Sequence, residues 1–154
     1  KTYNLAGLSF GFAVIRNSEL RTIWKNTSLG LISGVNIMGH VAALAAYKGG
    51  QEWLDQVLVY LKNNRDFLER YVAEKLPGLR MSKIEGTYLA WLDCREAGIP
   101  GNPFDFFLKE AKVALNDGAD FGRGGEGFVR LNFACPRKTL TEALDRMAAA
   151  LKRL

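Results

Sequence analysis

The chain has 154 residues, of which 48% are hydrophobic and 24% charged, and these are the proportions of a globular protein. No segment approaches the roughly 18 consecutive apolar residues of a membrane-spanning helix, which excludes that class. The net charge of +5 does not indicate nucleic-acid binding, because the basic residues are scattered among acids, as in KNNRDFLERYVAEK, and form no run interleaved with aromatic side chains.

The first fifty residues predict one short strand and two helices. The stretch LSFGFAVI, residues 8–15, is short and apolar enough for a buried strand, although its two glycines weaken it. Asn17 and Ser18 can cap the helix that follows, and a second helix is expected over residues 35–47. Because one strand and two helices cannot enclose a core, we expect partner structure upstream of this region.

A long helix is the strongest local signal in the chain. Apolar residues recur at steps of three and four over residues 51–76, which places them in one stripe along a single helix. Pro77 and Gly78 provide the stop. At 1.5 Å per residue such a helix is about 39 Å long, enough to link two lobes of a protein.

Residues after Gly78 predict a compact α+β unit. The stretches RMSKI and YLAWLD flank Gly86 and indicate a hairpin. Asn102 and Pro103 supply an N-cap and a proline at the first helical position, and a short strand is expected over Val113–Leu115.

The C-terminal part adds a strand and a helix to this unit. The alternating stretch FVRLNFA, residues 128–134, predicts a strand, and the final helix is expected to open on a capping box formed by Thr139 and Glu142. The glycine-rich GRGGEG before this strand does not fit a phosphate loop, which follows a strand and opens a helix. A flexible, hairpin-like connection is the favoured interpretation.

Arg130 is a charged residue within this apolar strand. Period-two alternation puts it on the face opposite Val129 and Leu131, between apolar neighbours, where a charge must find a partner or reach solvent. Its planar fork matches a carboxylate, which suits recognition of an amino acid. On pattern alone, a structural ion pair or an edge arginine is the favoured interpretation over a binding residue.

Other reactive residue types carry weaker signals. His40 lies in a helical stretch, where packing or exposure is favoured over catalysis. Cys94 and Cys135 form neither a disulfide framework nor a metal-ligand spacing, which indicates a reduced, cytoplasmic compartment and, for Cys135, an inert thiol. Arg137 can add charge to a substrate pocket, but a role at the helix start or surface is favoured.

Four stretches, taken in their order along the chain, resemble a known family of enzymes. KTYNLAGL at residues 1–8 resembles the Schiff-base lysine segment of fold-type I pyridoxal-phosphate enzymes in the class I/II aminotransferase superfamily. It is similar in particular to the branch of cystathionine β-lyase-type C–S lyases. The stretches EGTYLAWLD, VALNDGADFG and EGFVRLNFACPR resemble the small domain of that branch in content and order. The resemblance covers essentially the whole chain.

The resemblance implies roles for two residues and a division of the chain. Lys1 takes the place of the lysine that holds pyridoxal phosphate, and Arg130 takes the place of the arginine that grips the substrate α-carboxylate. The resemblance implies that residues 1–50 are the end of a large cofactor-binding domain. Residues 51–154 would then form a linking helix plus a small α+β domain. The fold class is then α/β, the intact enzyme is expected to be a homodimer, and an N-terminal half is expected to be missing.

Departures from the family pattern separate the possible activities. Many aminotransferases of the superfamily carry an arginine eight residues after the lysine, where this chain has Ser9, and this favours β-elimination over transamination. Ser33 falls in a loop that, in relatives, approaches the neighbouring subunit's cofactor phosphate. An aminotransferase on the same scaffold and an inactive fragment or binding module remain open. The 154 residues alone are not expected to catalyse efficiently, and they do not define which thioether is cleaved.

Overall fold

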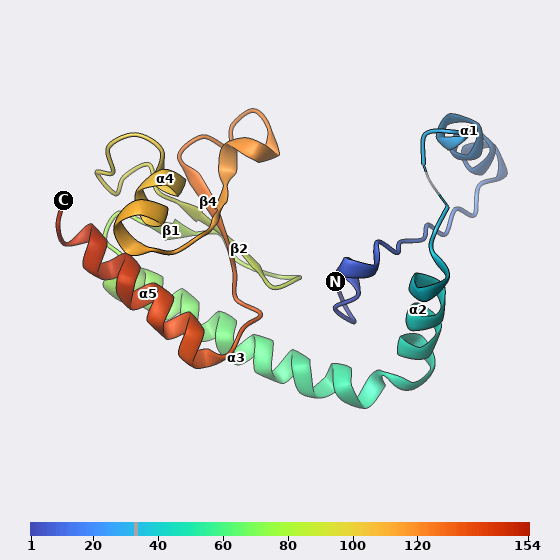
Figure 1. Ribbon diagram of the computed structural model, residues 1–154, viewed down its shortest axis with the longest axis horizontal. Helices are drawn as coiled ribbons and strands as arrows, with labels where there is room; N and C mark the ends of the chain where they lie inside the picture. Colours follow the sequence, from blue (N-terminus) through green and yellow to red (C-terminus); the bar gives the residue numbers. More distant parts are fainter. Residues whose placement is uncertain (33) are drawn as a thin grey trace. The chain divides into compact units, whose positions relative to one another are not determined.

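The computed structural model describes residues 1–32 and 34–154 (Figure 1). It divides into two compact units, Lys1–Gln56 and Val57–Leu154. The boundary between them falls within the helix α3, Gln51–Lys75. Across the described ranges, no helix is both long and apolar enough to cross a membrane.

The first unit contains short helical elements, of which α1 and α2 are capped by asparagines. It comprises the 3₁₀ turn η1 (Ala6–Leu8), α1 (Ser18–Ser28), α2 (Ile37–Gly49) and the first turns of α3. The side chain of Asn17 accepts a hydrogen bond from the backbone N–H of Leu20 at 2.9 Å, and that of Asn36 caps α2 in the same way. Both predicted helices are therefore confirmed, the second displaced by two residues.

The strand predicted over residues 8–15 is wrong. Leu8 closes η1, and residues 10–16 run on without belonging to a helix or a strand. Phe12 and Val14 are 63% and 81% exposed. A strand is held by hydrogen bonds to a neighbouring strand, and the described residues of this unit include none, so the apolar pattern by itself does not produce one.

Helix α3 confirms the long helix predicted from the apolar stripe. Leu68, Tyr71 and Val72 of that stripe are at most 6% exposed. The helix stops where predicted, because Gly78 adopts φ +77° and a Cβ at this position would lie 2.4 Å from the carbonyl oxygen of Glu96. Only glycine fits both the left-handed conformation and the close approach.

The second unit is built on a four-stranded antiparallel sheet. Its strands are β1 (Arg80–Met81), β2 (Leu89–Asp93), β3 (Asn116–Asp117) and β4 (Phe128–Asn132), in the order β1-β2-β4-β3. The predicted hairpin around Gly86 and the predicted strand FVRLNFA are confirmed. β4 lies between β2 and β3, so Val129 and Arg130 have a strand partner on both sides.

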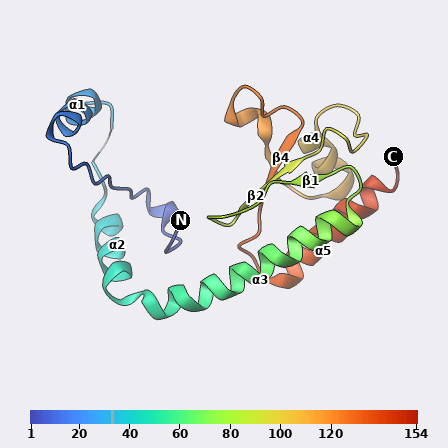
Figure 2. The same cartoon turned by 180° about the vertical axis from the view of Figure 1, so that it is seen from behind.

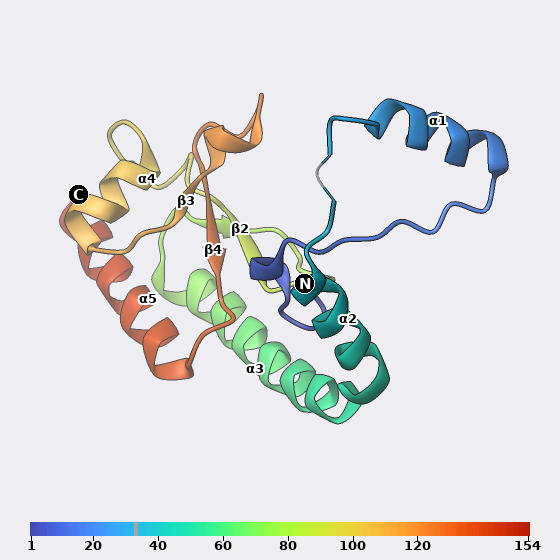
Figure 3. The same cartoon turned by 45° about the vertical axis from the view of Figure 1, so that its right-hand side comes forward.

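One face of the sheet forms the core with the helices. Ala90, Leu92, Val129 and Leu131 alternate along β2 and β4 and are at most 3% exposed. They pack into one cluster with apolar residues of α3, of α5 (Arg137–Leu151) and of the segment Pro103–Ala111. In this unit α3 and α5 run side by side (Figures 2 and 3). The opposite face of the sheet, which carries Arg130, is left outside this core.

Local signals around the third helical segment are partly confirmed. Asn102 caps α4 (Pro103–Phe106), which continues as the π-type turn η2 (Phe107–Ala111), as predicted from the Asn–Pro pair. The strand predicted at Val113–Leu115 is wrong, since pairing begins only at Asn116. Val113 instead packs its side chain in the core at 9% exposure, and hydrogen bonding to β4 begins three residues later.

The capping box predicted at Thr139 and Glu142 is also wrong. Helix α5 begins at Arg137 with Pro136 as its N-cap, so Thr139 already lies inside the first turn. Glu142 pairs with Arg146 one turn ahead and does not reach back to a cap. Arg137, the first residue of this helix, contacts α3, as described below.

The glycine-rich stretch connects β3 to β4 as a closely packed turn. The 3₁₀ turn η3 (Gly118–Phe121) precedes this stretch in the same connection. A Cβ on Gly125 would lie 2.0 Å from the carbonyl oxygen of Gly118, and a Cβ on Gly118 would lie 2.2 Å from that of Gly125. The hairpin-like connection is confirmed. Glycine is required at both facing positions, because the two backbones approach too closely to leave room for a Cβ.

Candidate active site

Lys1 lines a pocket in the first unit. The pocket has a volume of about 560 Å³, and its walls combine an amine, the hydroxyl groups of Thr2 and Ser9, and aromatic rings. The residues that line it include Lys1, Thr2, Tyr3, Ser9, Phe10, Phe12 and Tyr47. Lys1 and Ser9, two residues singled out from the sequence, therefore lie in one pocket.

Two contacts fix the backbone that carries these residues. The side-chain amide of Asn36 donates to the carbonyl oxygen of Leu8 at 2.9 Å, which ties the end of η1 to the start of α2. Ser9 follows in the left-handed conformation at φ 51°. A Cβ added to Gly39 would lie 3.2 Å from the Leu8 carbonyl oxygen, so α2 approaches this segment closely.

Tyr3 anchors the segment on its other side. Its ring contacts Tyr47 edge-on at 5.2 Å and stacks on Trp53 at 6.5 Å between centroids. A Cβ on Gly50 would lie 3.0 Å from the ring of Tyr3. Lys1 thus precedes a residue that is held by the end of α2 and the start of α3.

Ser33, the second serine considered for cofactor phosphate, lies outside the described residues. His40 is exposed, and its ring packs edge-on against Phe10 at 5.4 Å. Cys135 is partly buried, and this burial raises the pKa of its thiol. Cys94 is 4% exposed, and burial, with a smaller effect of Asp93, raises the pKa of its thiol to about 12. Both thiols are therefore protonated and weakly nucleophilic at neutral pH.

Arg130 lies on the outer face of the sheet in the second unit. It is partly buried, and its Cα partners are Trp91 on β2 and Asn116 on β3. Its Nε and Nη2 donate to the side-chain oxygen of Asn116 at 3.3 and 3.1 Å. Throughout the described ranges it forms no ion pair within the chain. The structural ion pair favoured by pattern alone is therefore not what holds Arg130.

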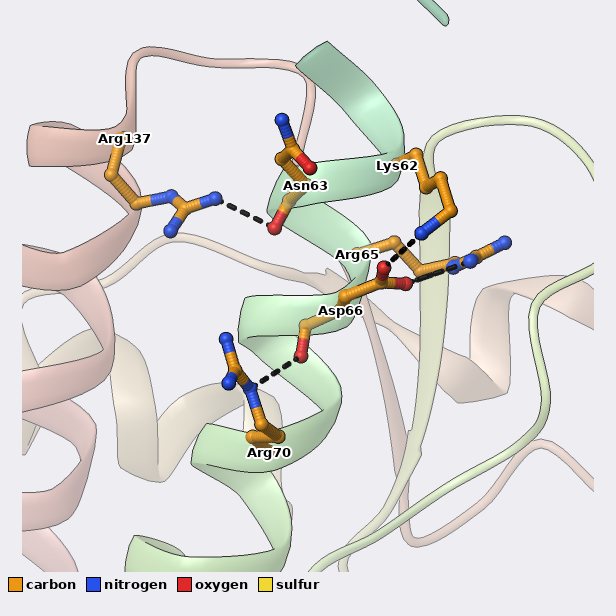
Figure 4. A network of polar contacts seen from close by, with 6 residues as sticks. All are labelled: Lys62, Asn63, Arg65, Asp66, Arg70 and Arg137. Carbon is orange, nitrogen blue, oxygen red and sulfur yellow. Dashed lines mark hydrogen bonds and ion pairs between the residues drawn. The ribbon is translucent and has the colours of Figure 1, made fainter. Parts of the chain in front are cut away.

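Arg137 has the role at the helix start that the sequence favoured. Its Nη2 donates to the backbone oxygen of Asn63 at 2.6 Å (Figure 4), and its Nε donates to the side-chain oxygen of Asn64 at 2.9 Å. The guanidinium also lies over the ring of Phe67, 4.3 Å from its centroid. These three contacts tie the start of α5 to α3.

Charged side chains next to this contact pair with one another along α3. The carboxylate of Asp66 accepts from Lys62 at 2.6 Å and from Arg65 at 2.7 Å (Figure 4). These hydrogen bonds, with the two positive charges, lower the pKa of Asp66. Arg70 donates to the backbone oxygen of Asp66 at 3.3 Å. These contacts stabilise one surface of α3.

Asn116 was not singled out by sequence reasoning. It lies in the stretch VALNDGADFG, but its relation to Arg130 depends on the pairing of β3 with β4. Within the described part of the chain, no cluster of three or more His, Cys, Asp or Glu side chains could hold a metal ion. The candidate groups are thus an amine and hydroxyls in one unit and a guanidinium in the other.

A family model described as aminotransferase class I and II matches residues 1–147 of the chain. The chain belongs to this family. Its α/β fold is the predicted one, since solved structures with pyridoxal phosphate in their descriptions match it at TM-scores of 0.87 and 0.84. The resemblance inferred from the four sequence stretches is confirmed.

Individual relatives share this region at substantial identity. Cystathionine beta-lyase of Corynebacterium glutamicum is 42% identical over 98% of this chain and 40% of the relative. A Corynebacterium diphtheriae structure, provisionally described as a PLP-dependent beta-cystathionase, is 43% identical with a TM-score of 0.87, over 98% of this chain and 40% of that one. A PLP-bound Clostridium difficile structure, provisionally described as an aminotransferase, is 38% identical with a TM-score of 0.84, over 97% and 39%. The chain spans about 40% of the length of the curated relatives it matches.

Proposed function

We propose that these residues are the C-terminal portion of a pyridoxal-phosphate-dependent carbon–sulfur β-lyase. The whole protein would convert cystathionine or another cysteine S-conjugate, with water, to a thiol, pyruvate and ammonia. The observation that carries this proposal is the 42% identity to a cystathionine beta-lyase across 98% of the chain. Ser9 supports it, because the resemblance associates arginine at this position with many of the aminotransferases.

The pocket around Lys1 fits the proposed cofactor chemically. A primary amine can condense with an aldehyde, a hydroxyl such as that of Ser9 can donate to a phosphate, and the rings of Phe10, Phe12 and Tyr47 suit an aromatic ring system. Ser33 is a second proposed phosphate contact. When bound, pyridoxal phosphate supplies an aldehyde that condenses with amines and a ring that takes up the electron pair left at the substrate Cα.

The chain's own residues then divide the work between proton transfer and orientation. The Nζ of Lys1 accepts the proton from the substrate Cα as a general base. The guanidinium of Arg130 binds the α-carboxylate through two parallel hydrogen bonds, which fixes the direction of the Cα–H bond. Departure of the thiolate from Cβ completes the elimination. The enamine product hydrolyses to pyruvate and ammonia.

The domain assignment is part of the same proposal. Residues 1–50 would end a large cofactor-binding domain, and residues 51–154 would form the linking helix and the small domain. Homodimerisation and a cytoplasmic location are proposed with it. On α1, Leu20, Ile23 and Trp24 are 58%, 60% and 50% exposed, and either the N-terminal part of the protein or a second copy would cover them. Sedimentation analysis of the intact protein tests the dimer, and a monomer at micromolar concentration contradicts it.

An aminotransferase on the same scaffold is the second candidate. The 38% identity to a structure provisionally described as an aminotransferase favours it. The two activities are separated by supplying the intact protein with L-cystathionine, with and without a keto acid. Pyruvate release without keto acid supports the lyase. Amino-group transfer that requires the keto acid, with no pyruvate release, replaces it with the transferase.

Lys1 can be tested without measuring turnover. Borohydride reduction of the intact protein incubated with pyridoxal phosphate, followed by peptide mass spectrometry, should place a pyridoxyl group on the Lys1 peptide. Lys1→Ala should abolish this modification, whereas Lys48→Ala in the last turn of α2 should leave it in place. An unmodified Lys1 in a folded, intact protein would favour a non-catalytic binding module.

A further inference from the structure

Arg130 ends a row of cations and aromatic rings on the outer face of the sheet. Its guanidinium lies over the ring of Phe121, 4.4 Å from the centroid. Phe121 meets Trp91 edge-on at 5.5 Å, and Trp91 stacks on Phe128 at 5.5 Å with 19° between the planes. Arg95 ends the row on the other side, 4.7 Å above Phe128. Two arginines therefore share similar aromatic support.

The two arginines differ in what neutralises their charge. Arg95 donates from Nε and Nη2 to the two carboxylate oxygens of Asp93 at 2.9 and 2.7 Å, which forms a bidentate ion pair. Arg130 donates to Asn116, whose amide oxygen is an acceptor without net charge. A partly buried guanidinium is stabilised far more by an anion than by a neutral acceptor. Arg130 is therefore the one that retains its charge for a ligand.

The hydrogen bonds to Asn116 also select an edge of the guanidinium. A guanidinium presents two edges to a carboxylate, one formed by Nε and Nη2 and the other by Nη1 and Nη2. Asn116 occupies the Nε–Nη2 edge, and the ring of Phe121 covers one face of the plane. The Nη1–Nη2 edge of Arg130 remains for a ligand.

Elements around this edge are fixed by the backbone. Asn116 belongs to β3 and lies directly opposite Arg130 in the β3–β4 register. Phe121 ends η3, whose position is set by the contact between Gly118 and Gly125. Asn116 thus reaches Arg130 from a paired strand, and Phe121 reaches it from a connection that cannot relax without separating two touching backbones.

We propose that Asn116 and Phe121 are positioning residues that aim the Nη1–Nη2 edge of Arg130 at the carboxylate of an amino-acid ligand. This inference rests on the proposed role of Arg130 in binding the substrate α-carboxylate. The absence of charge at residue 116 is essential to this positioning. An acidic side chain there would hold the guanidinium equally well but would cancel its charge.

This neutrality distinguishes positioning from a merely structural contact. Asn116→Asp keeps the shape and the acceptor oxygens, so it would preserve a contact that only supports the fold. We expect it instead to reduce the preference for a carboxylate ligand by about tenfold or more, because it forms an ion pair with Arg130. Phe121→Leu should reduce that preference by about three- to thirtyfold through loss of the cation–π contact.

Calorimetric titration of the intact, cofactor-loaded protein provides the measurement. L-alanine and L-alaninamide are suitable probes, because neither carries a leaving group at Cβ and they differ at the carboxylate. The preference is the ratio of their dissociation constants. Phe128→Leu is the matched control, since it removes the equivalent ring under Arg95 and leaves Arg130 untouched. Circular dichroism melting establishes that each variant is folded.

The outcomes separate this inference from the proposed function. If Arg130→Ala leaves the preference intact, Arg130 does not bind the carboxylate, and both its proposed role and the positioning role of Asn116 and Phe121 fall. If Arg130→Ala abolishes the preference while Asn116→Asp and Phe121→Leu retain it, the positioning role is overturned and the role of Arg130 stands. An equal loss in Phe128→Leu would show general damage to the sheet face and would also overturn positioning.

Discussion

Asn64 is the buried polar residue on which the joint between α3 and α5 depends. It is 0% exposed, and its side-chain nitrogen donates to the carbonyl oxygens of Phe133 and Cys135, both at 2.9 Å. Its side-chain oxygen accepts from Nε of Arg137 at 2.9 Å. One amide therefore holds the end of β4 and the start of α5 against a helix about seventy positions earlier in the chain.

The free energy at stake follows from these three bonds. Asn64→Ala leaves a buried and a partly buried carbonyl group without this donor, at about 1 kcal/mol each. It also removes a hydrogen bond to a charged group that contributes about 1.5–3 kcal/mol. Alanine returns roughly 0.5 kcal/mol through its higher helix propensity. We expect Asn64→Ala to lower the free energy of unfolding by about 3–4.5 kcal/mol.

Urea unfolding followed by far-ultraviolet circular dichroism measures this loss. Asn63→Ala is the matched control, because Asn63 is exposed and contributes only its backbone oxygen to the contact with Arg137. The control should change the free energy of unfolding by less than about 0.5 kcal/mol. A loss below about 1 kcal/mol in Asn64→Ala, or a loss equal to that of the control, would refute the reasoning.

Three further predictions follow from burial and close approach. Burial, with a hydrogen bond to the Asp145 carboxylate, raises the pKa of Tyr71 to about 12. Because the pKa is higher in the folded chain, this stabilisation is present below pH 10 and is lost as the pH rises through 12. Tyr71→Phe should therefore lower the free energy of unfolding by about 2 kcal/mol at pH 8, and by progressively less in thermal melts above pH 10. Gly125→Ala should lower the free energy of unfolding in urea by about 2–3 kcal/mol, since its Cβ would lie 2.0 Å from a backbone oxygen. Gly86→Ala, whose Cβ would have nothing within 4 Å, should lower it by less than about 1 kcal/mol. Equal losses in the two variants would contradict the packing argument. Cys94 should react with a thiol reagent at pH 8 only as fast as the chain unfolds, because it is 4% exposed and burial raises its pKa to about 12; rapid labelling under native conditions would contradict this.

Elements with strong local signals were predictable from the sequence. The apolar stripe and Gly78 predicted α3 and its end, because a helix is closed by hydrogen bonds between neighbours in the chain. The alternation around Arg130 predicted β4 and its buried face for a related reason, since successive side chains of a strand point to opposite sides. The asparagine caps of α1 and α4 also act within a few residues.

Strand pairing was not predictable in the same way. The strand expected at residues 8–15 does not form, although its composition is suitable, because a strand also needs a neighbour at its edge. The pattern at Val113–Leu115 reports burial, whereas the paired residues are Asn116 and Asp117, selected by the register of β4. Composition therefore locates apolar side chains and leaves the hydrogen-bonding partner undecided.

The candidate site shows the same division between local and distant information. The sequence alone determined the family resemblance, the long helix and the choice of Lys1 and Arg130 as residues to examine. Only the tertiary structure decided that a neutral amide, Asn116, and a ring, Phe121, hold the guanidinium of Arg130, because both contacts join different strands and turns. Such contacts depend on how the backbone of one element approaches another, and no spacing along a single segment encodes that distance.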